Sequence, residues 1–150
     1  MPVAPRAVRD LRVWQKSMDL VEACYRLSAM LPPEERFGLT SQIRRACTSV
    51  PANIAEGFGR WNSREFVRFL AIASGSLREL ETHLVISRRL GYVAGRSAEP
   101  LFRMIDDLAR MLYRMRLRVI ATLDKAQMPA QTVRNSPEPK RVPSRALSDY

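Results

Sequence analysis

The sequence predicts an all-α protein, folded as an antiparallel up-down bundle of four helices. Apolar residues recur along most of the chain at alternating spacings of four and three, the pattern of helices that bury one face. Only six glycines occur in 150 residues, too few for the many turns of an all-β fold. The connections between the apolar rows are short, and short connections favour antiparallel neighbours in a bundle.

The first helix is expected from residue 10 to about residue 30. Asp10 is the predicted N-cap, because a carboxylate there can accept hydrogen bonds from the first free N–H groups. Pro32 and Pro33 end the helix, since neither can continue its hydrogen bonding. Spacings of four, three and four residues mark the predicted inner face: Trp14, Met18, Val21 and Tyr25.

The second helix is expected over residues 39–59. Pro51 lies inside it, removes one backbone hydrogen bond, and should kink or break the helix there. The predicted inner face comprises Leu39, Ile43, Cys47, Val50 and Ile54.

The third helix has the clearest end signals. Asn62, followed three residues later by Glu65, is a capping pair, and Gly91 stands where a helix end needs a left-handed residue. Gly75 costs about 1 kcal/mol relative to Ala inside a helix. Close approach of another helix, from the same chain or from a neighbouring subunit, would offset that cost. The predicted inner face comprises Phe66, Leu70, Ala73, Leu77, Leu80, Leu84 and Ser87.

The fourth helix is expected from near Ser97 to about Asp124. Its inner face comprises Leu101, Ile105, Leu108, Leu112, Met115 and Val119. The predicted organisation is therefore a flexible N-terminus over residues 1–9, a bundle over residues 10–125 and a disordered tail over residues 126–150. That tail is rich in Pro, Ser and basic residues, and it cannot bury enough apolar surface to offset the entropy of ordering.

Composition points to anionic partners. The formal charge is +10, and most of the basic residues are Arg, whose guanidinium fork binds phosphate at two points. Such a field attracts nucleic acid or anionic lipid. No apolar run approaches the ~20 residues of a membrane span, and the N-terminus lacks the apolar stretch of a signal peptide. We therefore expect a cytoplasmic protein, with Cys24 and Cys47 buried as small apolar residues.

Five segments of the chain carry a family resemblance. They are Asp10–Lys16, Phe37–Ala46, Ser49–Gly57 with Arg60 after it, Ala73–Glu81 and Leu90–Tyr92. Together, and in this order, they resemble the four helix bundle protein family, also known from intervening sequences of 23S ribosomal RNA. The resemblance covers about residues 10–120 and excludes the residues after Gln127.

The resemblance implies a left-handed up-down bundle and assembly into a homo-oligomer, a pentameric ring. A related branch comprises the accessory proteins of diversity-generating retroelements, which are basic pentamers that bind a reverse transcriptase and nucleic acid. Membership implies no enzymatic activity and no cofactor.

A group of polar residues lies in the second helix. Asn53, Glu56, Gly57 and Arg60 follow at i, i+3, i+4 and i+7, so they share a face if the helix continues past Pro51. One interpretation is a hydrogen-bonded network in the fold or at a subunit interface, and the other is a ligand contact. No nucleophile–base pair accompanies them, so no catalytic residue is predicted. Further residues of the family segments that could join this network are Arg44, Arg45, Ser74 and Glu79.

A row of arginines marks the fourth helix. Arg110, Arg114 and Arg118 step by four along one face, and Arg103 lies seven residues before Arg110. One interpretation is a solvated face partly balanced by Asp106 and Asp107. The other is a phosphate-binding ridge that a ring would present in several copies. Secondary nucleic-acid candidates, near the turn between the third and fourth helices, are Arg88, Arg89 and Arg96.

Two remaining residues invite a functional interpretation. His83 is the only histidine, and no Cys or second His stands at ligand spacing, so no metal site is predicted. Trp61 lies in the turn between the second and third helices, where it either stacks on a base or packs into the turn.

The sequence thus predicts a basic, oligomeric adaptor that acts by binding rather than by catalysis. Its expected partner is RNA or DNA, the resemblance adds a reverse transcriptase, and no membrane is involved. The alternative is a protein–protein scaffold whose positive charge is incidental.

Overall fold

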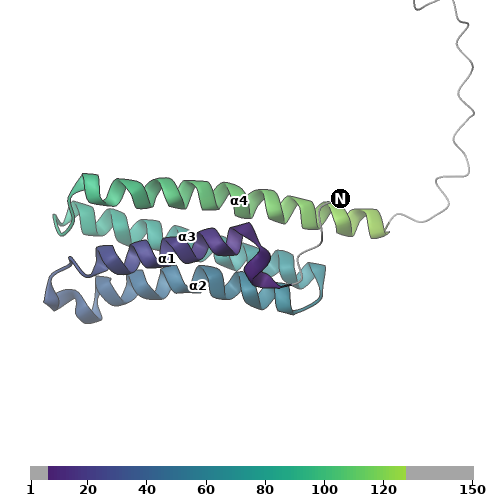
Figure 1. Cartoon of the computed structure of the whole chain (residues 1–150), viewed down its shortest axis with the longest axis horizontal. Helices are drawn as coiled ribbons and strands as arrows, with labels where there is room; N and C mark the ends of the chain where they lie inside the picture. The colour runs from purple at the N-terminus through teal and green to yellow at the C-terminus, as the bar shows by residue number, and fades with distance from the viewer. Residues whose placement is uncertain (1–6, 128–150) are drawn as a thin grey trace, which may run out of the picture.

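A computed structural model describes residues 7–127, which form four α-helices and two short 3-10 helices. The elements are η1 (Val8–Asp10), α1 (Arg12–Ser28), η2 (Pro33–Phe37), α2 (Leu39–Gly59), α3 (Ser63–Arg89) and α4 (Gly95–Gln127). Consecutive α-helices run in opposite directions along a narrow bundle (Figure 1). The all-α prediction is confirmed. The predictions for residues 1–6 and 128–150 lie outside the described residues.

Each α-helix packs against two others, so the four surround one core. α1 and α3 both lie against α2 and α4, whereas the backbones of the diagonal pairs, α1 with α3 and α2 with α4, lie farther apart. The predicted face of α2 is confirmed, with Ile43, Cys47, Val50 and Ile54 buried and Leu39 partly buried. The predicted faces of α3 and α4 are confirmed too, although Phe66, Met115 and Val119 are only partly buried.

The inner face predicted for α1 is wrong by one position. Met18 is 37% exposed and Tyr25 is 43% exposed. Ser17 occupies a core position because its hydroxyl donates to the Trp14 carbonyl oxygen at 2.6 Å, which satisfies its polar group without water. The residues that α1 buries are Val13, Ser17, Leu20, Cys24, Leu27 and Ser28.

The predicted helix ends are partly confirmed. Asp10 does not cap α1; its carboxylate accepts from the Ala7 N–H at 2.9 Å and closes η1 instead. Asn62 does cap α3, with its side-chain oxygen accepting from the N–H groups of Arg64 and Glu65 at 2.9 and 3.1 Å. Gly91 has a φ of +75°. The N–H groups of Gly91 and Tyr92 close the end of α3, as expected of a left-handed C-terminal residue.

α2 runs past Pro51 as one continuous helix, so a break at this proline is ruled out. Farther along α2, Gly57 makes the close approach to α3: a Cβ atom there would lie 2.6 Å from the Cβ of Phe69. Gly75 faces open space, with nothing within 4 Å of the position a Cβ would take. The approach of a helix from the same chain to Gly75 is therefore ruled out.

Candidate nucleic-acid interface

A groove of about 920 Å³ lies between the first half of α1 and the middle of α4. We call it the α1–α4 groove. Its apolar side chains are partly or fully buried: Leu11, Val13, Met104, Leu108, Met111 and Met115. Its exposed polar side chains are Arg12 and Lys16 from α1, Arg110, Arg114 and Arg118 from α4, and the acids Asp10 and Asp107.

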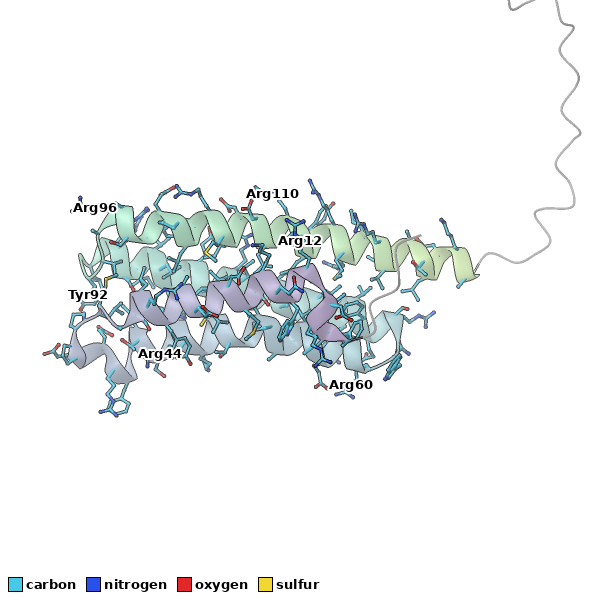
Figure 2. All side chains as sticks on the ribbon, viewed as in Figure 1. Arg12, Arg44, Arg60, Tyr92, Arg96 and Arg110 are labelled. Atoms are coloured by element: carbon cyan, nitrogen blue, oxygen red, sulfur yellow. The ribbon has the colours of Figure 1, made fainter. Side chains whose placement is uncertain are left out.

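Helix periodicity places the cations along this groove. Residues four apart lie on one face of an α-helix, so Arg110, Arg114 and Arg118 form one row. Because α1 and α4 are antiparallel neighbours, the start of α1 lies beside the middle of α4, and Arg12 and Lys16 enter the same groove. Figure 2 shows Arg12 and Arg110 near each other along the bundle.

Cations outnumber carboxylates in the groove. Arg110 pairs with Asp107, and Lys16 pairs with Asp19 at 3.3 Å. Within residues 7–127, Arg12, Arg114 and Arg118 form no ion pair with an acidic side chain. Their guanidinium groups are exposed, so they can bind an external anion without first losing a protein partner.

The other predicted arginines lie elsewhere. Arg103 does not line the groove and lies 3.7 Å from Glu99. Arg88 stacks over the ring of Phe102 at 5.1 Å. Arg89 and Arg96 are exposed near the α3–α4 turn, at the far end of the bundle (Figure 2).

Arg12 and Lys16 were not among the predicted residues. Their spacing of four was visible, but the groove arises only because two helices distant in the sequence lie together. The antiparallel order of the helices was the signal that could have joined the two basic rows.

The polar residues of the family segments form separate small groups rather than one network. Arg45 bridges α2 to Glu79 of α3 at 3.2 Å, and the Nε2 of His83 lies 3.6 Å from the same carboxylate. Glu56 pairs with Arg60 on the exposed surface of α2.

Hydroxyl groups join α2 to α3 near the middle of the bundle. The Oγ atoms of Ser49 and Ser76 are 2.8 Å apart, and Asn53 donates to Ser49. Ser74 donates to the carbonyl of Leu70 within its own helix.

Arg44 forms its own contacts with α1. Its Nε donates to the Ser28 hydroxyl at 3.0 Å, and its guanidinium lies 4.8 Å from the Tyr25 ring centroid. These contacts join α2 to α1, which favours the structural interpretation for Arg44.

The expectations for cysteine and for metal can also be compared with the structure. Cys24 and Cys47 are free and fully buried, and their mutual hydrogen bond raises the pKa of the Cys24 thiol. Residues 7–127 contain no group of three or more His, Cys, Asp or Glu side chains that could hold a metal ion. No helix in that range combines the length and the apolar character that crossing a membrane requires.

Comparisons with known proteins agree with the fold. A family model described as 23S rRNA-intervening sequence protein matches residues 9–114. A solved structure of similar fold is a protein with unknown function from the S23 ribosomal protein family of Bacteroides thetaiotaomicron VPI-5482. It is 26% identical and superposes with a TM-score of 0.64, covering 69% of this chain and 96% of that one. No curated protein matches the chain.

The matched region ends within the groove. α4 continues from Arg114, where the family match ends, to Gln127. Met115 and Arg118 of the groove therefore lie beyond it.

Proposed function

Since the family match covers well over half of its residues, this chain belongs to the 23S rRNA-intervening sequence protein family, and we propose that it binds nucleic acid through the α1–α4 groove. It acts by binding rather than by catalysis. Phosphate groups are the ligands of the exposed cations, because charge-assisted hydrogen bonds from guanidinium to phosphate are short and strong.

The observation that carries this proposal is the convergence of five cationic side chains from two helices on one groove. Three of them form no ion pair within the described range. A solvated surface row, the other interpretation of the α4 arginines, would be expected to carry its own acidic partners as i,i+3 or i,i+4 pairs. Arg114 and Arg118 form no such pair with any side chain of residues 7–127.

A gel shift with a structured RNA at low and at high salt tests the proposal. Binding should weaken steeply as salt rises, because phosphate contacts release condensed counterions. Replacing Arg110, Arg114 and Arg118 together by Gln should abolish the shift at intermediate salt.

A matched control removes the same charge elsewhere. Arg26, Arg36 and Arg78 lie outside the groove, and their triple Gln variant should bind as the wild type does. Equal weakening by both triple variants would show that only net charge matters. No shift of the wild type at low salt would refute the proposed function.

We further propose that the chain assembles into a homopentamer, as the resemblance implies. The open surface at Gly75 supports this, since a helix of a neighbouring subunit can approach there. Light scattering should give five times the 17.1 kDa protomer mass. A monomer at micromolar concentration would refute the assembly.

The related retroelement proteins extend the proposal to a reverse transcriptase as a protein partner. A neighbouring reverse-transcriptase gene with template and variable repeats would support this role. Placement of the gene inside a ribosomal RNA operon would favour the intervening-sequence role instead.

A protein–protein scaffold is the second candidate function. The observation that favours it is the apolar part of the groove, lined by Met104, Met111 and Met115. Methionine side chains are flexible and adapt to apolar protein surfaces, whereas binding of phosphate requires only the cationic groups. Partners that stay bound after nuclease treatment, and that the groove triple variant still captures, would favour the scaffold.

A further inference from the structure

Trp61 is the most exposed large apolar side chain of residues 7–127, at 91%. It lies in the turn between α2 and α3, and its φ of +53° falls in the left-handed region. It is the one non-glycine residue with a positive φ among those residues. A bulky side chain is strained there, and glycine would suit the backbone better.

Nothing within the described fold accounts for an indole at this turn. Trp61 forms no hydrogen bond, ring–ring contact or cation–π contact with residues 7–127. Of the two alternatives for this residue, packing into the turn is therefore ruled out. The turn is fixed by its neighbours: the Arg60 N–H donates to the Gly57 carbonyl at 3.3 Å, and Asn62 caps α3.

Basic side chains flank the indole. Arg60 pairs with Glu56 and also lies 5.6 Å from the Phe69 ring centroid. Arg64, three residues after Trp61, is exposed and forms no ion pair with an acidic side chain in the described range. An exposed aromatic face therefore lies close in sequence to a guanidinium that can bind an anion.

The turn lies at the end of the bundle toward which the Arg118 side of the α1–α4 groove extends. The α2–α3 connection and the last part of α4 occupy that end, and α1 begins on the same half of the bundle (Figure 1). Figure 2 places Arg60 and Arg12 toward it and Arg96 and Tyr92 at the opposite end.

We propose that Trp61 is a stacking platform for an unpaired base, so that the bound nucleic acid is single-stranded at this end of the bundle. The inference rests on the proposed nucleic-acid function and specifies its substrate. The indole stacks on the base, and Arg64 binds an adjacent phosphate. A base within a duplex cannot present its face in this way, because its neighbours already cover both faces.

Phe37 provides a matched control. It is 86% exposed and lies beside an arginine, as Trp61 does. However, its ring is already covered by Arg36, whose guanidinium is 5.3 Å from the centroid. It lies in η2, near the α1–α2 turn and away from the groove end (Figure 1). Phe37→Ala removes an exposed aromatic residue without touching the proposed platform.

The test compares binding of an oligouridine of about 12 nucleotides with binding of a blunt RNA duplex, by fluorescence anisotropy at low salt. Trp61→Ala should weaken oligouridine binding about tenfold or more and leave duplex binding unchanged. Trp61→Phe should retain most of the affinity. Phe37→Ala should match the wild type for both probes.

Direct contact can be detected in a Trp14→Phe background, which leaves Trp61 as the only tryptophan. Oligouridine should quench its fluorescence in a saturable manner, and duplex should not. Because Trp61 and Phe37 are exposed, the variants at these two positions should keep the helical circular-dichroism spectrum and the oligomeric mass of the wild type.

The outcomes are distinguishable. If the wild type binds neither probe, both the proposed nucleic-acid function and the stacking role of Trp61 are refuted. If the wild type binds oligouridine and Trp61→Ala binds it equally well, only the stacking role is overturned. If Trp61→Ala instead changes the oligomeric mass, the indole contacts a second copy of the chain and the inference is wrong.

Discussion

Tyr92 donates a hydrogen bond from its hydroxyl to Oε1 of Glu35 at 3.3 Å and so joins the α3–α4 turn to the start of α2. The other carboxylate oxygen of Glu35 accepts the Leu39 N–H at 2.8 Å, which satisfies a free donor in the first turn of α2. One side chain therefore caps a helix and fixes a turn that lies 57 residues away in the sequence.

Replacing Glu35 by Ala should destabilise the bundle. The variant loses the helix cap and the tyrosine contact, and we expect a loss of about 1–2 kcal/mol in the free energy of unfolding. Glu34→Ala is the matched control, because Glu34 is exposed and forms no hydrogen bond or ion pair within residues 7–127. Urea denaturation of both variants checks this, and equal stability of the two would contradict the capping role.

The same contact predicts a dependence of stability on alkaline pH. Partial burial and the nearby carboxylate of Glu35 raise the pKa of Tyr92 above its ordinary value of 10.0. Since the folded-state pKa exceeds the unfolded-state value, the stabilising contribution is fully present below about pH 10 and is lost as pH rises through the folded value.

A difference titration checks this pH dependence. The phenolate absorbance of the wild type minus that of Tyr92→Phe should show a group that ionises later than a free tyrosine. A midpoint at or below the free value would contradict the arrangement.

The two internal helix glycines should respond oppositely to alanine. A Cβ at Gly57 would lie 2.6 Å from the Cβ of Phe69, so Gly57→Ala should cost about 1–3 kcal/mol through overpacking. A Cβ at Gly75 meets open space, so Gly75→Ala should leave the fold of the chain as stable or stabilise it by up to about 1 kcal/mol.

Thermal unfolding measures both changes, and a larger loss at Gly75 than at Gly57 would contradict the close packing of α2 on α3. Light scattering of Gly75→Ala adds a test of assembly. A smaller mass with unchanged helicity would locate a neighbouring subunit at this surface.

Leu77→Asp should unfold the bundle. Leu77 is fully buried in α3, and an unpaired carboxylate there cannot be hydrated. We expect a loss of more than about 4 kcal/mol, against about 0.5 kcal/mol or less for Thr82→Asp on the exposed side of the same helix. Circular dichroism of the purified variants distinguishes them, and a stable, soluble Leu77→Asp protein would show that the register of α3 is wrong.

Much of the fold could be predicted from the sequence because long aliphatic side chains mark the buried faces of α2, α3 and α4. The face of α1 could not, because its core includes Ser17 and Cys24, while Met18 and Tyr25 beside them remain substantially exposed. A small hydroxyl that bonds to its own helix leaves no apolar signature. Asp10 was misassigned for a related reason, since the same carboxylate can close a 3-10 turn as readily as cap an α-helix.

The candidate site was predicted in part. Arg110, Arg114 and Arg118 could be found from their spacing of four along one helix. Arg12 and Lys16 were not joined to them, because their place in the groove follows from the packing of α1 beside α4 and not from any spacing along one helix. The exposure of Trp61 was likewise undetermined, since a turn aromatic can either pack or project and no local pattern distinguishes the two.

The salt dependence of RNA affinity tests the central claim most directly. Each phosphate contact contributes about 0.7–0.9 to the slope of log affinity against log salt. The Gln triple variant at Arg110, Arg114 and Arg118 should therefore lower the magnitude of that slope by about 2, while the control triple at Arg26, Arg36 and Arg78 should leave it unchanged. Identical slopes for the wild type and the groove variant would contradict phosphate binding in the α1–α4 groove.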